Sequence, residues 1–284
     1  MNNYSEDEVS YIPSMTNAKI DLIAPIDVID EKGRQKKTYI PAERPLTIYV
    51  NKFELVTLMT LGEMPEALVL GYLRNQRIVS KITQVDSIQV DWDINSAAVV
   101  IKDLDSRSIT EKIEKKTVTT GCGQGTIFGD IEEDFDRLKL SASAKLKQST
   151  LISIVDVIRK HESVYKKAGS VHGCALFEQS KMILFVEDVG RHNAVDSIAG
   201  MMWLERLKGE NLVFYTTGRL TSEMVIKGAQ MGIPFLLSRS GVTQMGVKMA
   251  RQVNLALFGR CSGKHFLLFS GFKRFISEYN DEYK

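Results

Sequence analysis

The chain has 284 residues, of which 44% are hydrophobic and 25% are charged. This composition is that of a globular protein with room for two modest domains, and it excludes a fibrous or collagen-like chain. The 37 Lys and Arg residues nearly balance the 35 Asp and Glu residues, so no strong overall field attracts nucleic acid or an anionic membrane. We therefore expect neither as a partner, and local groups must hold any anion that the protein binds.

Residues 1–17 are polar and acidic and lack the apolar segment of a secretion signal. No stretch reaches the roughly 18 apolar residues of a membrane span. We expect a flexible tail and a cytoplasmic protein. The three cysteines are too few and too far apart for a disulfide framework, and no C-x-x-C pair indicates a structural zinc. Reduced thiols are therefore expected.

Residues 18–143 are predicted to form a smaller, mostly β domain that ends in a cysteine loop (121–126) and a polar linker. Alternating apolar residues predict two strands, 46–50 and 53–59, that form a hairpin. Pro65 stands where a first helical residue would, before a short helix. Further strands are expected at 88–92, 97–101 and 109–119.

Residues 144–284 alternate between helix and strand, which predicts a three-layer α/β domain, in a protein that is α/β, or α+β overall. Its first helix is expected to start near Leu151, with Ser149 or Thr150 as the cap, and to end at a turn at Gly169. The remaining strands are expected at 173–177, 183–186, 212–215, 235–237, 255–258 and 266–269, and the helices at 193–207, 221–231 and 244–253.

Four of these strands are followed by arginine next to or near glycine. Ligands of open α/β sheets lie beyond the carboxyl ends of the strands, and the arginine fork suits bidentate phosphate contacts. Three of the segments lead into helix N-termini, which favour anions. Any single segment is explained by turns and helix caps, but four together favour a polyanion such as a nucleotide diphosphate, provided that the sheet is mostly parallel. The segments are Glu187–His192, Thr216–Arg219, Ser238–Gly241 and Gly259–Gly263.

The flanking glycines of Cys122 would leave its sulfur uncovered, and nearby lysines would favour the thiolate that nucleophilic or persulfide chemistry requires. A chance cysteine in a tight turn is an equally open interpretation. Cys174, inside an apolar strand, is expected to be buried. Cys261 follows an arginine and could be exposed, which makes it a weaker second candidate.

The sequence His172-Gly173-Cys174 resembles part of a zinc deaminase signature, which is H-x-E followed by P-C-x-x-C. Both the glutamate and the cysteine pair are missing here, so we expect no zinc. A structural role is expected for His172. For His192, acid-base chemistry, a phosphate contact and simple packing all stay open.

Several segments carry a resemblance in chain order, of which EDVGRHNA at 187–194 is the most specific. Together they cover most of the chain from about residue 40 onward. On these segments the chain resembles the FdhD family of formate dehydrogenase accessory sulfurtransferases. The other segments lie at 43–51, 67–73, 171–177, 217–219, 231–234 and 258–260 and around Cys122.

The resemblance implies a sulfur carrier that takes persulfide sulfur from a cysteine desulfurase. The sulfur is then delivered to the bis-molybdopterin guanine dinucleotide molybdenum cofactor needed by the formate dehydrogenase apoenzyme. Cys122 matches the persulfide-carrying cysteine. The resemblance also implies a C-terminal domain similar to the cytidine deaminase fold, and a homodimer. The expected cofactor-binding residues are Phe258, Gly259, Arg260, Cys261, Ser262 and Gly263, with Arg191 and Arg219.

One departure concerns the loop of Cys122. Many members of the family have a second cysteine there, spaced C-x-x-C, where this chain has Gly125. A single persulfide can still transfer sulfur, but no neighbouring thiol is present to resolve it. A non-catalytic carrier that binds and delivers the same cofactor is therefore the alternative function.

Overall fold

The chain forms two compact units, neither of which is continuous in sequence. No helix of the described residues is long and apolar enough to span a membrane. The computed structural model describes residues 11–102, 118–119, 125–126, 135, 138 and 140–279. The first unit takes residues 1–127, 162–173 and 186–207, and the second takes 128–161, 174–185 and 208–284.

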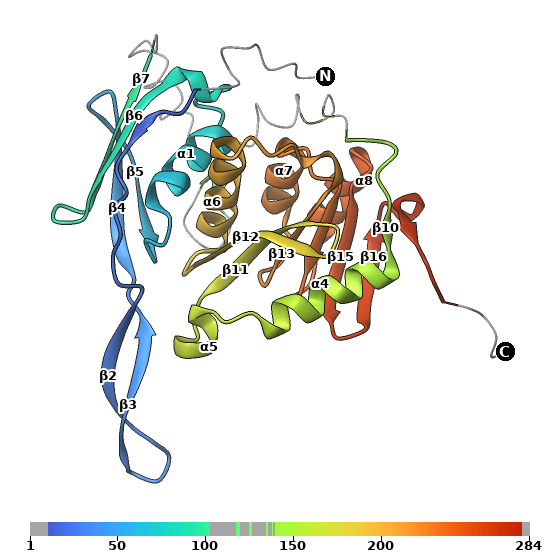
Figure 1. The fold of residues 1–284 in the computed structure, drawn as a ribbon, viewed down its shortest axis with the longest axis horizontal. Helices are drawn as coiled ribbons and strands as arrows, with labels where there is room; N and C mark the ends of the chain where they lie inside the picture. Colours follow the sequence, from blue (N-terminus) through green and yellow to red (C-terminus); the bar gives the residue numbers. More distant parts are fainter. Residues whose placement is uncertain are drawn as a thin grey trace. The chain divides into compact units, whose positions relative to one another are not determined.

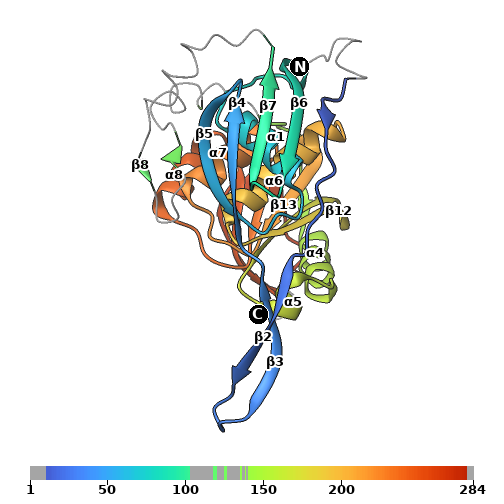
Figure 2. The ribbon, with the colours of Figure 1, turned by 90° about the vertical axis from the view of Figure 1, so that its left-hand side faces the viewer.

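A five-stranded sheet in the order β1-β6-β7-β4-β5 forms the first unit's framework, and Figure 2 shows its strands side by side. The predicted hairpin is confirmed as the antiparallel pair β4 and β5. Its turn residues Asn51 and Lys52 both have positive φ, 46° and 78°, which suits the tight turn of a hairpin. The strands are β1 (Ser14–Met15), β4 (Arg44–Val50), β5 (Phe53–Thr60), β6 (Val85–Asp91) and β7 (Ser96–Ile101), with the short helix η2 (Ile82–Gln84) before β6.

Most of the strand predicted at 109–119 lies outside the described residues. Its last two residues form β8 (Val118–Thr119), which pairs antiparallel with β9 (Gly125–Thr126). Cys122 lies between these two strands in sequence and is itself outside the described residues.

Two helices of the first unit, α1 (Pro65–Asn75) and α6 (Arg191–Leu204), pack backbone against backbone. A Cβ on Gly71 would lie 1.7 Å from the Asp196 carbonyl oxygen, and one on Gly200 would lie 1.9 Å from the Ala67 carbonyl oxygen. Asn75 Nδ2 also donates a hydrogen bond to Asp196 Oδ1 (2.6 Å). The two glycines therefore let the helices approach more closely than any side chain would permit.

The EDVGRHNA segment begins with two carboxylates that are bound by surrounding donors. Asp188 is buried and accepts hydrogen bonds from the Thr60 hydroxyl, Leu61 N–H, Gly190 N–H and Asn193 Nδ2. Burial raises the pKa of Asp188, and these hydrogen bonds oppose the shift. Since Thr60 ends β5 and Leu61 follows it, Asp188 links the start of α6 to the sheet of the same unit.

The side chain and the backbone of Glu187 connect two further segments of this unit. Its carboxylate accepts from the N–H groups of Val164 (2.5 Å) and Tyr165 (3.2 Å) at the start of the short helix α5 (Val164–Ala168). Its own N–H donates to Glu63 Oε2 (2.7 Å). Burial raises the pKa of Glu63 to about 7, opposed by the hydrogen bond from Glu187 and reinforced by the charges of Glu187 and Asp188.

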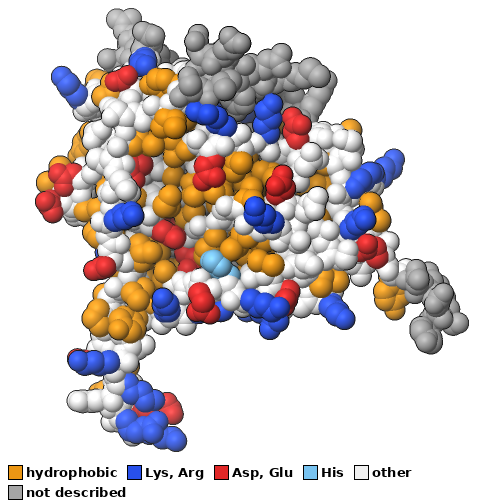
Figure 3. Space-filling view, viewed as in Figure 1, with side chains coloured by type: hydrophobic (Ala, Val, Ile, Leu, Met, Phe, Trp, Pro, Cys, Tyr) orange, Lys and Arg blue, Asp and Glu red, His pale blue; other side chains and the backbone are white. Residues whose placement is uncertain are grey.

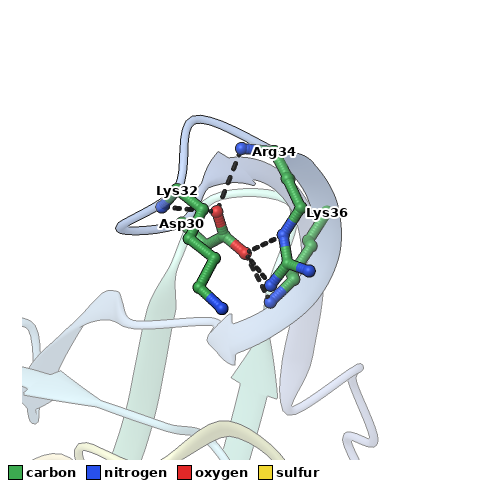
Figure 4. Close-up of polar contacts among 4 residues, drawn as sticks. All are labelled: Asp30, Lys32, Arg34 and Lys36. Atoms are coloured by element: carbon green, nitrogen blue, oxygen red, sulfur yellow. Dashed lines mark hydrogen bonds and ion pairs between the residues drawn. The ribbon is translucent and has the colours of Figure 1, made fainter.

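A two-stranded hairpin precedes β4, made of β2 (Ile23–Ile29) and β3 (Gln35–Pro41). Its tip is organised by Asp30, whose carboxylate accepts from the N–H groups of Lys32 and Arg34 (Figure 4). The same carboxylate pairs with the Arg34 guanidinium (2.7 Å) and the Lys36 ammonium (2.8 Å). Lys36, Arg34 and the two N–H groups hold the pKa of Asp30 well below its usual range.

The second unit contains a six-stranded sheet in the order β12-β11-β13-β14-β15-β16 (Figure 1). Strands β13, β14 and β15 are parallel to one another, while β11 and β16 run antiparallel to their neighbours β13 and β15. The α/β alternation predicted from the sequence is thus confirmed. The strands are β11 (His172–Glu178), β12 (Lys181–Asp188), β13 (Leu212–Thr216), β14 (Phe235–Ser238), β15 (Ala256–Ser262) and β16 (His265–Ser270), with a small pair β10 (Leu146–Lys147) and β17 (Phe275–Ile276).

Helices cover both faces of this sheet. Leu151 and Ile154 of α4 (Gln148–Lys160) share a core with Phe235 and Leu237 of β14. On the other face, Gly228 of α7 approaches Leu236 so closely that an added Cβ would lie 2.8 Å from its methyl groups. The remaining helices are α7 (Ser222–Gln230), α8 (Gln244–Gln252), η3 (Gly209–Asn211) and η4 (Phe272–Arg274).

The first predicted helix of this half was wrong at both ends. It starts at Gln148 with Lys147 as the N-cap, so neither Ser149 nor Thr150 caps it, and the N–H of Ser149 instead donates to Glu278 Oε2 (2.6 Å). The helix ends at Lys160, and the Gly169 turn, with φ 67°, closes the separate helix α5. A carboxylate from the far end of the chain thus replaces the expected local cap.

We predict that Gly200→Ala destabilises the protein by about 3 kcal/mol or more, because the new Cβ would collide with the backbone of α1. Urea unfolding followed by circular dichroism measures the change. Gly241→Ala is the matched control, since a Cβ at that position meets no atom within 4 Å. An equal loss of stability in both variants would contradict close helix packing as the cause.

A second prediction concerns Glu63, whose pKa is raised to about 7 in the folded protein. The folded state therefore keeps a proton that the unfolded state has lost, and stability falls as pH rises from about 4.5 through about 7. The loss is at most about 3 kcal/mol. Glu63→Gln cannot ionise, so it should gain stability relative to the wild type between pH 5 and pH 8.

The measurement is the free energy of unfolding in urea at both pH values. Glu43→Gln, at an exposed position of the same unit, is the control. If Glu63→Gln and Glu43→Gln follow the same pH dependence as the wild type, the carboxyl of Glu63 is not the titrating group.

Candidate functional site

Three neighbouring strands of the second unit end at one edge of its sheet. Because β13, β14 and β15 are parallel, their carboxyl ends and the segments that follow them meet there. The sequence predicted this convergence only on the condition that the sheet is mostly parallel, and for these three strands the condition holds. Ligands of α/β sheets bind at such an edge.

Two hydroxyl groups fix the turns at this edge. Thr216 and Ser238 are register partners at the ends of β13 and β14. Thr216 Oγ1 accepts from the Gly218 N–H (3.1 Å). Ser238 Oγ donates to the Gly218 carbonyl (2.6 Å) and accepts from the Ser240 N–H (2.9 Å). One serine thereby connects the turn after β13 to the turn after β14.

The backbone of β15 extends this network. The Arg260 N–H donates to the Ser240 carbonyl (2.6 Å), and Arg260 itself has φ 56°, which is unusual for a residue other than glycine. The register of β15 against β16 shifts between Gly259 and Ser262. A Cβ on Gly259 would lie 3.1 Å from both Val242 and Phe269, so the strand passes closely beneath the turn after β14.

Three exposed arginines extend from these connected segments: Arg219, Arg239 and Arg260. Among the residues that the structure describes, no hydrogen bond or ion pair engages their guanidinium groups. Arg239 lies near enough to Tyr215 for its charge to oppose the rise that burial causes in the pKa of the Tyr215 hydroxyl. We call these three side chains the arginine edge.

The arginine edge differs from the predicted site. Arg239 was not among the predicted site residues, although the sequence analysis placed it in one of the four strand-end segments. The same sequence pattern marks Arg239, Arg219 and Arg260: each is an arginine close to a glycine after an apolar run that predicts a buried strand.

Residues 259–263 were predicted to follow the end of a strand at Phe258. This prediction was wrong, because β15 continues to Ser262. Phe258 is fully buried among the rings of Phe266 and Phe275. Arg260, Ser262 and Gly263 are exposed. Only these three of the six residues therefore present side chain or backbone to a ligand from solvent.

Cys261 is not exposed, contrary to the expectation. Its side chain lies in the hydrophobic core beneath α4, with 1% of its surface accessible. Burial raises the pKa of the thiol to about 12, opposed by a hydrogen bond from the Ser238 backbone, so the reactive thiolate is disfavoured. Cys174 is buried as predicted, with its thiol 3.4 Å from the Thr216 hydroxyl.

Arg191 belongs to the first unit and is the first residue of α6. Only 5% of its surface is accessible, which sets it apart from the exposed arginines of the second unit. Its predicted contact with a cofactor phosphate stays a prediction. His192, next to it, is also buried, and His161 packs edge-on against Phe185 at 4.3 Å between ring centroids. Within the described part of the chain, no three His, Cys, Asp or Glu side chains gather as a metal site.

Comparison with known proteins agrees with the family resemblance that the sequence motifs carry. A model of the FdhD/NarQ family matches residues 41–276. A protein of Listeria monocytogenes serotype 4b (strain F2365), named sulfur carrier protein FdhD, is 29% identical over 237 residues, which cover 83% of this chain and 90% of that protein. A protein of the same name from Wolinella succinogenes is 27% identical over 248 residues and covers 86% of each chain.

The fold also matches a solved structure, described as that of a formate dehydrogenase accessory protein from Desulfotalea psychrophila. The TM-score is 0.70 at 24% identity, over 89% of this chain and 98% of the other. This likeness supports the fold, and the family model covers most of the sequence. The chain therefore belongs to the FdhD/NarQ family.

Proposed function

We propose that this protein is a sulfur carrier for formate dehydrogenase maturation. It would receive sulfur as a persulfide from a cysteine desulfurase and deliver it to the bis-molybdopterin guanine dinucleotide molybdenum cofactor, bound as cargo. The names of the relatives support the sulfur-carrier part. In the structure, the arginine edge is the observation that supports the proposed binding of the cofactor.

The chemistry of the arginine edge fits such a cargo. Each guanine dinucleotide carries a pyrophosphate, and a guanidinium group donates two parallel hydrogen bonds to phosphate oxygens. Three exposed like charges on segments that hydrogen bonds connect repel one another, and a polyanion between them would remove that repulsion. Helices α7 and α8 begin directly after the turns, with Thr221 and Thr243 as their N-caps, and their N-termini favour negative charge.

Cys122 is the proposed sulfur-carrying residue, on the strength of the sequence and the family resemblance. In the first step its thiolate attacks the outer sulfur of a desulfurase persulfide. An S–S bond forms at Cys122 and the desulfurase thiolate leaves, so no oxidant is consumed. The buried thiols of Cys174 and Cys261 are poorly placed to compete for this sulfur.

A second candidate function is a carrier that delivers the cofactor without sulfurating it. Gly125, which occupies the position of the second loop cysteine, favours this alternative. Cys122→Ala distinguishes the two functions. It should abolish the delivery of sulfur by a sulfur carrier, but it should not affect a simple carrier, which needs only the arginine edge.

We predict that incubation with a cysteine desulfurase and cysteine adds one sulfur to the protein, about 32 Da, which reductant removes. Intact-protein mass spectrometry would detect it in the wild type and in Cys261→Ala but not in Cys122→Ala. No gain in any protein, with an active desulfurase, would favour the carrier. A gain that persists in Cys122→Ala would move the chemistry to another cysteine.

The arginine edge is tested by the binding of GDP, the terminal part of the cargo. Replacing Arg219, Arg239 or Arg260 with Gln should each weaken binding by roughly tenfold or more, because each change removes a charge-assisted hydrogen bond. Isothermal titration calorimetry at fixed salt measures the affinity. Arg251→Gln, at an exposed arginine of α8, should leave it unchanged. Equal effects at all four positions would reveal only nonspecific attraction by positive charge.

A further inference from the structure

A cavity of about 540 Å³ lies at the amino ends of the parallel strands in the second unit. Val213 and Phe235, which line it, are register partners at the starts of β13 and β14. The arginine edge lies at the carboxyl ends of the same strands, about 15 Å away along the five residues of β13. All residues that line the cavity belong to the second unit. The cavity is therefore a place of its own, of a size that commonly holds a small ligand.

The cavity has an apolar floor and a polar rim. The floor is made of three buried side chains that share the core with α4, Leu146, Val213 and Phe235. The rim bears two ammonium groups, two carboxamides, one hydroxyl and one carboxylate, from Lys145, Lys147, Gln179, Asn211, Thr150 and Glu178. Within the described part of the chain, no hydrogen bond or ion pair engages the rim side chains other than that of Lys145. Five polar groups around one cavity thus remain open to a ligand.

The two lysines give one side of the cavity a local positive charge. Lys145 Nζ donates to the Lys273 carbonyl (2.6 Å), which holds the ammonium group in place and leaves two of its three donors for a ligand. Lys147 is the N-cap residue of α4. Hydrogen bonds from Ser149, and then the charge of Lys147, lower the pKa of Glu278, which places the Lys147 charge at the first turn of α4.

This positive charge is local. Figure 3 shows Lys and Arg side chains mixed with Asp and Glu side chains over the face that it draws. No broad basic surface on that face would compete with the cavity for a small anion. The pair of lysines is therefore the feature that would select an anionic group here.

The other rim groups suit hydroxyl groups. The carboxamides of Gln179 and Asn211 both donate and accept hydrogen bonds, and the Glu178 carboxylate accepts them from hydroxyl donors. The same carboxylate would repel a second anionic group. Of the nine lining residues, all of which the structure describes, only Phe235 is aromatic, and 2% of its surface is accessible. The lining therefore fits a molecule with one anionic end and several hydroxyl groups, and it offers no ring on which a nucleobase could stack.

We propose that this cavity binds a small sugar phosphate, a ligand distinct from the cargo of the arginine edge. Lys145 and Lys147 bind the phosphate through charge-assisted hydrogen bonds. Glu178, Gln179 and Asn211 bind the sugar hydroxyls, and the carbon atoms of the sugar lie on the apolar floor. The ligand thereby connects four segments that are separate in sequence: β10, the start of α4, the turn after β11 and the start of β13.

Saturation-transfer NMR titration of the full chain with ribose 5-phosphate tests the proposal. A ligand of about 14 non-hydrogen atoms with ordinary ligand efficiency binds with a dissociation constant of about 1 mM. We expect such a value for the wild type. Ribose and inorganic phosphate, measured by competition, should each bind at least about tenfold more weakly, because each makes only part of the contacts.

Two variants locate the site. Lys147→Gln should weaken the binding of ribose 5-phosphate by about fivefold or more, because it removes a charge-assisted hydrogen bond. Gln179→Gly should weaken it by about threefold or more. It removes a carboxamide at a position with φ 53°, which glycine adopts without strain. Lys248→Gln removes the same charge as Lys147→Gln at an exposed position of α8 and should leave the affinity unchanged.

Four outcomes overturn the proposal. The first is that ribose 5-phosphate at 20 times the expected dissociation constant, about 20 mM, gives no saturation transfer. The second is an unchanged affinity in both Lys147→Gln and Gln179→Gly. The third is displacement of ribose 5-phosphate by excess GDP, which would place the phosphate at the arginine edge. The fourth is that AMP, which carries the same ribose 5-phosphate group, binds more tightly than ribose 5-phosphate, which would indicate a nucleotide site.

Discussion

The direct contact between the backbones of α1 and α6 is the constraint on which the first unit depends. Gly71 and Gly200 are 129 positions apart in sequence, yet each lies against the backbone of the other helix. Because α6 is fixed in this way, the EDVGRHNA segment that starts it is fixed as well, and its carboxylates reach donors on the chain after β5 and at the start of α5. The segment that carried most of the sequence resemblance thus has a clear structural role in this chain.

In the second unit the dominant constraint is a set of hydrogen bonds at one edge of the sheet. The turns after β13 and β14 are joined by the Ser238 hydroxyl, and β15 is joined to them through the Arg260 N–H. The backbone at this edge is therefore held by its own hydrogen bonds, whereas the exposed arginine side chains must lose rotamer freedom when they bind an anion.

The alternation of strands and helices was readable from the sequence because buried strands such as β13 and β14 are short apolar runs between turn residues. The sequence analysis could state only as a condition that the strands carrying these segments are parallel, and β13, β14 and β15 meet that condition. Tertiary features were not readable. The carboxylate of Glu278 replaces a local cap at α4 across 129 positions, and no periodicity announces such a contact.

The errors around Cys261 and Phe258 share a physical cause. A glycine and an arginine after an apolar run usually mark the end of a strand, but here an irregular register and a positive φ at Arg260 let β15 continue. The irregularity turns the Arg260 side chain to solvent while Cys261 returns to the core. The burial of Arg191 was equally hidden, since an arginine at a helix start reads as a surface residue.

The hairpin of β2 and β3 has a consequence for solubility. Both of its strands are exposed over most of their length, and unpaired edges of this kind invite other chains to add strands to them. Ile26, Ile29 and Tyr39 would strengthen such growth, and Lys36 and Lys37 lie on β3 among them. The Asp30 carboxylate pairs with Lys36, and Lys37 stands opposite Asp27 in the strand register, so an aggregating strand would have to dock beside charged side chains.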